Sequence, residues 1–253
     1  MSFPRQCLAL AVSLALLAAV PVAGAPLVCF SIVVDDPSPL PFGTTATADE
    51  NKPTVPLDEL PRKLAALFAA NGEIELHMEA LRRASFACEN EPCRESPVDE
   101  STVTAGVGLP STWTRLLGVL ESAVIAAELL PESAADTADR RARAWFDLGY
   151  AREVGATMGH CSARGLACLE KAAALAPTDG GVRFGAAIAA FQAEEIERDG
   201  VRPTQGWRPH LAAALVKPTP QLSANLMSTF GAFLDLKDLE QLRAAVHDER
   251  PGR

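Results

Sequence analysis

The sequence has few of the residues that build β-sheets. Aromatic residues make up 6% of the chain, with a single tyrosine, and clusters of Val or Ile nearly vanish after residue 34. Alanine, by contrast, is abundant. Because β-branched and aromatic side chains favour strands while alanine favours helix, the composition predicts an all-α fold.

Positive charge is also scarce. The chain carries 23 Lys and Arg against 32 Asp and Glu, a formal net charge of −9. Its basic residues are scattered, and the densest group is the short run Arg140, Arg141 and Arg143. A phosphate backbone is bound by clustered cations, so nucleic acid is excluded as an expected partner and this run is interpreted as a solvated helix face.

Only the N-terminus has a long apolar run. Arg5 precedes the apolar stretch 8–20, and the small residues Ala23, Gly24 and Ala25 follow, which is the order of a secretory signal peptide. We therefore expect residues 1–25 to be removed and the mature chain to be exported by a bacterium, to the periplasm or the medium. The alternative is an uncleaved membrane anchor, because residues 8–34 carry no charge and are long enough to span about 30 Å.

Proline divides the remaining chain into two parts. The run Leu27–Val34 is the only strand-like one, and six prolines between residues 37 and 61 remove backbone donors. We expect an extended Pro-rich arm over residues 26–56 and an α-helical repeat domain over 57–253. The sequence leaves open whether the arm packs against the helical domain. Helical spacing of apolar residues predicts helices near 57–70, 74–87, 111–130, 134–158, 163–176 and 180–198, with two or three more up to residue 247.

Two helix ends resemble each other. Ala172–Pro177 reads A-A-A-L-A-P and Ala212–Pro218 reads A-A-A-L-V-K-P, each followed by threonine. A period near forty residues is typical of stacked helical hairpins. The alternative is a chance likeness between two Ala-rich amphipathic helices.

A family resemblance covers about residues 143–236. The residues that carry it are Trp145, Leu148, Gly149, Ala172, Leu175 and Pro177. They resemble the tetratricopeptide repeat (TPR), which implies an α-solenoid of antiparallel hairpins that binds another exported protein or peptide. Arg152 stands where the family has tyrosine, and the unit is four residues longer than usual. A shorter stretch around Met78–Ala84 resembles uncharacterised exported bacterial proteins and implies no function.

The resemblance also implies a binding groove. With Trp145 in the conserved packing position, it turns Arg143, Phe146, Tyr150 and Glu153 toward the concave face. Mixed aromatic and charged side chains suit peptide binding. The alternative is that the aromatic residues belong to the core.

Five cysteines remain once Cys7 leaves with the signal peptide. In an oxidising compartment we expect the local disulfides Cys88–Cys93 and Cys161–Cys168, which leaves the role of Cys29 open. Seven residues along one helix separate alpha carbons by about 10 Å, whereas a disulfide needs about 4.4 to 6.8 Å. At least one of the second pair must therefore lie in a turn.

Chemical motifs are few. His160, Cys161 and Cys168 could act as soft metal ligands, but a fourth ligand is missing, so no metal or cofactor is predicted. His77 and Glu79 followed by Pro92–Cys93 resemble part of the zinc deaminase signature, yet Ser96 replaces its last cysteine.

Sequence motifs of nucleophilic hydrolases, zinc proteases and nucleotide-binding loops are absent. No catalytic residue is predicted. We expect a non-catalytic exported interaction module. An exported enzyme or metal-handling protein that uses His160 and its neighbouring thiols is the alternative.

Overall fold

The computed structural model describes residues 31–43, 51–89, 110–132, 136–196 and 206–247. Within these ranges the chain forms helices, and the only β-type pairing is an isolated bridge between Phe42 and Pro53. The all-α prediction is confirmed. No helix in the described ranges is long and apolar enough to cross a membrane. The predicted signal peptide lies outside them.

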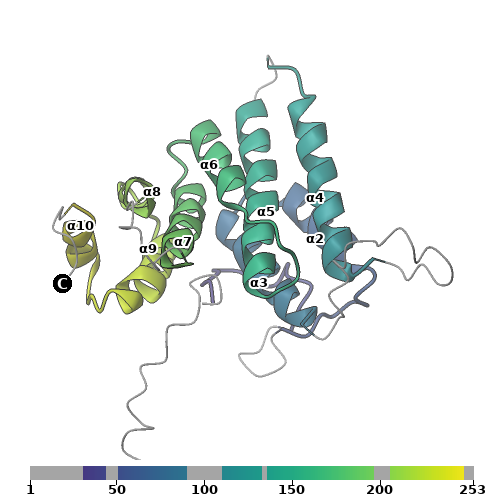
Figure 1. The fold of residues 1–253 in the computed structure, drawn as a ribbon, viewed down its shortest axis with the longest axis horizontal. Coiled ribbons are helices and arrows are strands. Elements are labelled where there is room, and N and C mark those ends of the chain that lie inside the picture. The colour runs from purple at the N-terminus through teal and green to yellow at the C-terminus, as the bar shows by residue number, and fades with distance from the viewer. Residues whose placement is uncertain (1–30, 44–50, 90–109, 133–135, 197–205, 248–253) are drawn as a thin grey trace, which may run out of the picture.

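The helices follow the predicted order closely (Figure 1). Ser111 begins the third as predicted, because its hydroxyl accepts a hydrogen bond from the Thr114 N–H at 3.1 Å. The elements are α2 (Leu60–Ala70), α3 (Ile74–Ala87), α4 (Thr112–Glu128), α5 (Thr137–Thr157), α6 (Leu166–Leu175), α7 (Gly180–Ile196), α8 (Trp207–Ala214), α9 (Pro220–Leu226), the π-helix η4 (Met227–Gly231) and α10 (Leu239–His247).

Helices α5 to α8 pack in the succession expected of helical hairpins. Helix α5 contacts α6, α6 contacts α7 and α7 contacts α8, while α5 also contacts α7. Glycine allows the closest approach, since a Cβ on Gly149 would lie 2.8 Å from Leu169 Cγ. On its other side α5 packs against α4, and α4 packs against α2. This arrangement is compatible with a helical solenoid.

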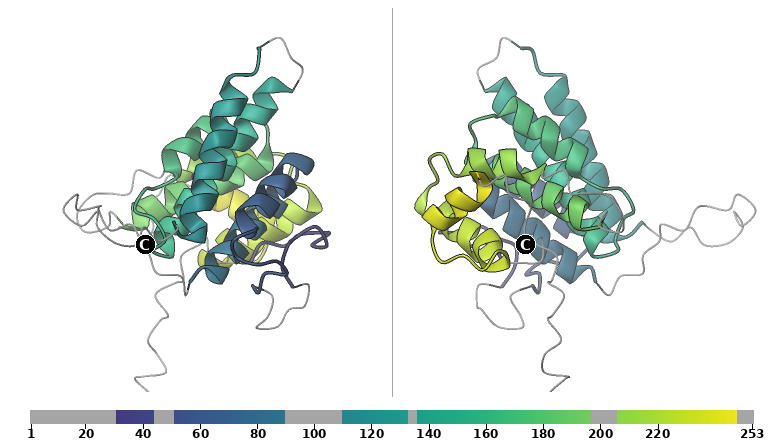
Figure 2. Two further views of the ribbon diagram at one scale, coloured as in Figure 1. Left: turned by 90° about the vertical axis from the view of Figure 1, so that its right-hand side faces the viewer. Right: turned by 60° about the vertical axis from the view of Figure 1, so that its left-hand side comes forward.

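Helix α3 occupies the face where α5 and α7 meet. It contacts both helices, and 11 of its 14 residues are buried. Ile74 packs against Gly181 of α7, where an added Cβ would lie 2.9 Å from Ile74 Cβ. In Figure 2 the blue N-terminal helices lie to one side of the teal and green hairpins. Helix α3 thus covers part of the surface of α5 and α7.

The described part of the arm packs on the helical body. Ile32, Leu40 and Phe42 are buried in the same core as the helices. The Arg83 guanidinium donates a hydrogen bond to the Gly43 carbonyl at 2.8 Å. The sequence did not show whether the arm packs against the helices, and the structure shows that residues 31–43 do.

Candidate functional site

The structure corrects the predicted binding groove. Phe146 and Tyr150 are fully buried, with their rings stacked at a centroid distance of 5.8 Å, and Glu153 is 1% exposed. Phe146 points into α7, where a Cβ on Gly185 would lie 2.5 Å from its ring. These three side chains line no groove, since Phe146 faces α7 and Glu153 is covered by the loop before α6.

Glu153 is held inside the protein by neighbouring groups. Its carboxylate accepts a hydrogen bond from the Gly165 N–H at 3.1 Å and pairs with Arg164 at 3.0 Å. Burial raises the pKa of the Glu153 carboxyl. Its contacts fix the loop before α6, which is a structural role.

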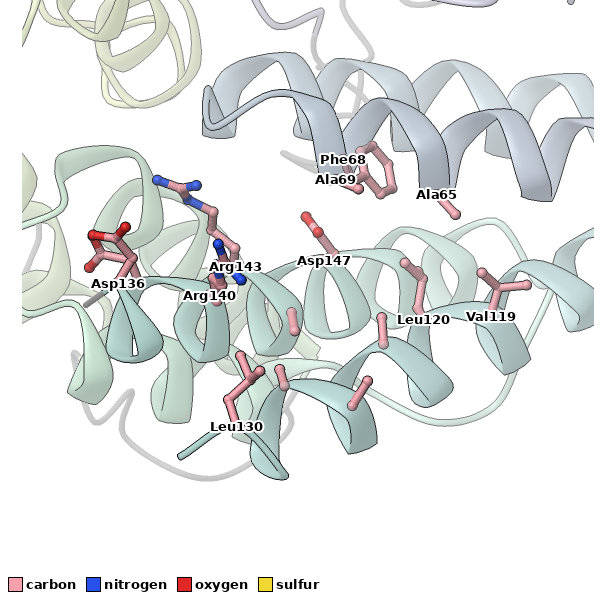
Figure 3. Close-up of a pocket in the computed structure, with 15 residues that line it drawn as sticks. Ala65, Phe68, Ala69, Val119, Leu120, Leu130, Asp136, Arg140, Arg143 and Asp147 are labelled. Atoms are coloured by element: carbon pink, nitrogen blue, oxygen red, sulfur yellow. The ribbon is translucent and has the colours of Figure 1, made fainter. Parts of the chain in front are cut away.

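An open groove lies elsewhere, between α2, α4 and α5 (Figure 3). Its volume is about 780 Å³. Small and aliphatic side chains line most of it, with Phe68 from α2: Ala65, Ala69, Val119, Leu120, Ala123, Ala126, Ala127, Leu130 and Ala144. We call it the α2–α4–α5 groove. Alanine leaves it open, since side chains of that size cannot fill the space between the helices.

Charged residues of α5 line one end of this groove. Among them are Arg140 and Arg143, one turn apart, together with Asp136 and Asp139 (Figure 3). Within the described residues, neither guanidinium forms a hydrogen bond or an ion pair. Arg143 is half-buried and also lines a smaller cavity of about 330 Å³ beside α7. Of the four residues predicted for the binding groove, it alone lines an open surface.

A buried ion pair lies beneath the groove. Asp147 Oδ1 is 2.7 Å from His77 Nδ1, and His77 Nε2 donates a hydrogen bond to the Asn71 carbonyl at 3.1 Å. Since that carbonyl is an acceptor, the nitrogen facing it carries the proton. Burial lowers the pKa of His77, but the charge and hydrogen bond of Asp147 oppose it and the pKa is raised overall. The pair joins α3 to α5 and holds the end of α2.

The lining of the groove suits binding better than covalent chemistry. Among the residues that the structure describes, the lining offers no serine, threonine or cysteine that the His77–Asp147 pair could activate. Both ring nitrogens of His77 are engaged. The geometry therefore indicates a structural role for this pair.

The His160 ring contacts a backbone carbonyl and a tryptophan ring, which are not soft metal ligands. His160 Nε2 lies 2.8 Å from the Ser85 carbonyl, and its ring packs on Trp113 at 5.2 Å. In the part of the chain that the structure describes, no group of three or more His, Cys, Asp or Glu side chains could hold a metal ion. The imidazole instead joins the loop after α5 to α3.

The predicted disulfide between Cys161 and Cys168 is not present in the structure. The Cys161 thiol faces the carbonyl of Arg152 at 3.5 Å, while Cys168 Sγ accepts a hydrogen bond from the Arg152 guanidinium at 3.7 Å. The two sulfurs thus contact opposite ends of one residue. Cys88 is buried, and its predicted partner Cys93 lies outside the described residues, as does Cys29.

No protein-family model, curated protein or solved structure matches this chain.

The sequence contained a signal for the α2–α4–α5 groove. Val119, Ala123 and Ala126 recur at helical spacing on α4, with Leu130 directly after its end, beside the core stripe that includes Leu120 and Val124. A second apolar stripe on one helix indicates a second covered or binding face. The contribution of α2 leaves no such signal, because it depends on how distant segments pack.

Proposed function

We propose that this chain is a non-catalytic, exported protein–protein interaction module with a TPR-like scaffold, and that it binds a segment of another exported protein in the α2–α4–α5 groove. The observation that carries the proposal is an open groove with an apolar lining and two arginines at one end whose guanidinium groups have no partner among the described residues.

The hairpin succession supports the TPR-like scaffold. Gly149, one of the residues that carry the resemblance, lies where α5 approaches α6 most closely. The two similar segments, Ala172–Pro177 and Ala212–Pro218, end helices α6 and α8, and both helices pack against α7. In this proposal the binding surface differs from that of the family, because the open groove lies between α2, α4 and α5 and the residues that the resemblance turns toward a concave face are buried.

The lining defines the chemistry of the partner. Alanines on α2 and α4 accept apolar side chains, and about 780 Å³ is room for a few of them. Arg140 and Arg143 suit a carboxylate, which guanidinium groups bind through paired hydrogen bonds. We therefore expect an apolar segment with an acidic side chain or a C-terminal carboxylate.

Binding variants test this proposal. The mature chain serves as bait for the exported proteins of its source, and the affinity of the purified partner is then measured by calorimetry. Ala126→Glu fills the groove and Arg143→Glu reverses its charge, so each is expected to weaken binding at least about tenfold, or ~1.4 kcal/mol. Arg62→Glu, on an exposed part of α2, is the matched control. Equal affinity of all three variants would contradict the proposal.

The export part of the proposal has its own test. It rests on the charged, apolar and small residues of the first 25 positions. The intact mass of the chain recovered from outside the cytoplasm should correspond to cleavage near residues 23–26. A full-length mass in the membrane fraction would indicate the uncleaved anchor instead.

A further inference from the structure

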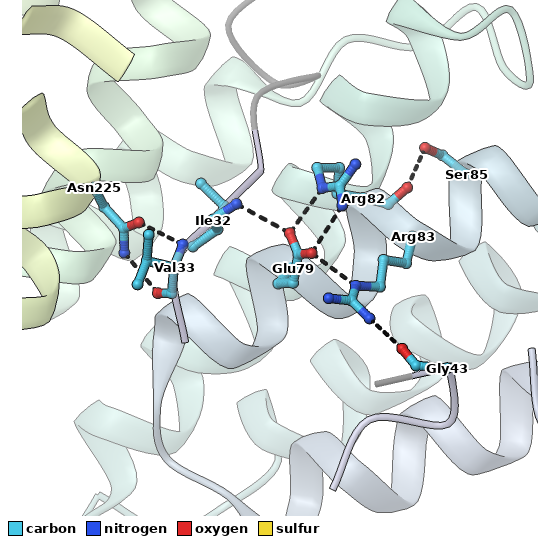
Figure 4. A network of polar contacts seen from close by, with 8 residues as sticks. All are labelled: Ile32, Val33, Gly43, Glu79, Arg82, Arg83, Ser85 and Asn225. Atoms are coloured by element: carbon cyan, nitrogen blue, oxygen red, sulfur yellow. Dashed lines mark hydrogen bonds and ion pairs between the residues drawn. The ribbon is translucent and has the colours of Figure 1, made fainter. Parts of the chain in front are cut away.

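Side chains of the helical body hold the backbone of the arm (Figure 4). The Ile32 N–H donates a hydrogen bond to Glu79 Oε2 at 3.0 Å. The Val33 N–H donates to Asn225 Oδ1 at 2.6 Å, and Asn225 Nδ2 donates to the Val33 carbonyl at 3.0 Å. Two residues on, the Asp35 N–H donates to Gln221 Oε1 at 3.0 Å. Carboxylate and amide groups from α3 and α9 thus take the place of a neighbouring strand.

The side chains of this segment alternate as in a strand. Ile32 is 4% exposed, Val33 is 46% exposed and Val34 is partly buried against the core. A period of two residues is that of extended backbone. The backbone of this strand-like run therefore forms its hydrogen bonds with side chains on helices. Of its own side chains, only those that point inward contact the core.

The groups that hold the arm are themselves fixed. Asn225 is fully buried, so its amide needs the arm or an equivalent backbone to satisfy it. Glu79, 2% exposed, is oriented by Arg82 at 2.7 Å and Arg83 at 2.7 Å. Gln221 donates to Glu73 Oε1 at 2.6 Å, which points its carbonyl at the arm. Such fixed donors and acceptors are preorganised for a peptide backbone.

We propose that this surface of α3 and α9 is a binding site for an extended peptide segment of another protein, which the chain's own arm occupies in cis. The ligand class is an extended segment with a β-branched apolar residue at the position of Ile32. Hydrogen bonds to backbone groups are independent of sequence, and within the hydrogen-bonded residues 32–35 Ile32 is the buried side chain, so its position selects the ligand's side chain. This site shares no residue with the α2–α4–α5 groove and does not rest on the function proposed for it.

The test uses variants of the full chain in which residues 32–35 of the arm are displaced from the site. Ile32→Asp places a charge in the buried position, and Val33→Pro removes the N–H that binds Asn225. The probe is a fluorescent peptide of residues 30–38, followed by anisotropy. Both variants, shown to be folded by circular dichroism, should bind it at 1:1 and at least about tenfold more tightly than the natural chain. The reason is that a tethered arm competes at an effective concentration of about a millimolar.

Two controls separate a peptide site from a fold requirement. Adding Asn225→Ala to either arm variant should abolish binding, whereas adding Ser223→Ala should not, since the Ser223 hydroxyl bonds within α9 to the Thr219 carbonyl. In the peptide, Ile32→Asp should abolish binding and the outward change Val33→Thr should alter affinity less than about threefold.

Three results would overturn the proposal: folded arm variants that do not bind, binding that survives Asn225→Ala, or a Val33→Thr peptide that fails. If the arm variants do not fold, hydrogen exchange on the natural chain decides. A millimolar excess of peptide should then speed exchange at the Ile32 and Val33 amides while α3 stays protected, and unchanged exchange would overturn it equally.

Discussion

The ion pair between Glu79 and Arg82 can be tested by measuring the stability of the protein. Both side chains are buried: Glu79 is 2% exposed and Arg82 is 3% exposed. The carboxylate accepts two hydrogen bonds from Arg82, at 2.7 and 2.8 Å, one from Arg83 at 2.7 Å and one from the Ile32 N–H at 3.0 Å. Removing the Glu79 side chain takes its carboxylate away from the buried guanidinium of Arg82.

Glu79→Ala should lower the free energy of unfolding by about 3–5 kcal/mol, the cost of removing one partner from a buried ion pair. For a domain of this size that is a fall in Tm of about 6–20 °C. Urea denaturation followed by circular dichroism measures it. Glu121→Ala is the matched control, since Glu121 pairs with Arg152 at 2.8 Å but is half exposed, and its loss should cost at most about 1 kcal/mol. A change below 1 kcal/mol for Glu79→Ala would refute the reasoning.

Three further results are expected. Gly165→Ala should destabilise by about 3 kcal/mol or more, because its Cβ would lie 1.7 Å from a carbonyl oxygen of α5, while Gly118→Ala, with open space around it, should stabilise by about 0.5–1 kcal/mol; the reverse order in urea denaturation would contradict this packing. Burial lowers the pKa of His77, but the charge and hydrogen bond of Asp147 outweigh burial and raise this pKa overall. The His77–Asp147 pair therefore stabilises the fold fully below about pH 6.5, and this stabilisation is lost as the pH rises through the pKa of His77 in the folded protein. His77→Gln should flatten the fall in urea midpoint from pH 6.5 to 9, and an equally steep fall would count against the ion pair. Cys161 and Cys168 should both react with a thiol reagent after unfolding without reductant, and a linked peptide in mass spectrometry would instead restore the disulfide.

Local signals allowed the helices to be predicted. Ser111 and Pro131 set the bounds of the third predicted helix because a cap and a missing donor act within one turn. The turn at Thr219–Pro220 begins α9 for the same reason. Neither signal depends on distant parts of the chain, so a single sequence is enough to locate such helix ends.

Long-range packing could not be predicted in the same way. Phe146 and Tyr150 have the spacing of a groove-lining face, but both are buried, and α7, about forty residues later in the chain, packs against the Phe146 ring at Gly185. The pairing of Val33 with Asn225 spans 192 residues. No local pattern encodes either contact, so the sequence could not show that the predicted groove residues are buried or that the open groove lies between α2, α4 and α5.

Photocrosslinking in the α2–α4–α5 groove tests the proposed function most directly. A photoreactive phenylalanine derivative at Leu130, a large side chain that already lines the groove, is compared with one at Glu240 on α10, which lies at the other end of the molecule from α2 and α4 (Figure 1). The proposal predicts that the partner crosslinks at position 130, that the crosslink disappears with Arg143→Glu and that position 240 gives none. Equal crosslinking at both positions, or a crosslink at position 130 that Arg143→Glu leaves unchanged, would contradict it.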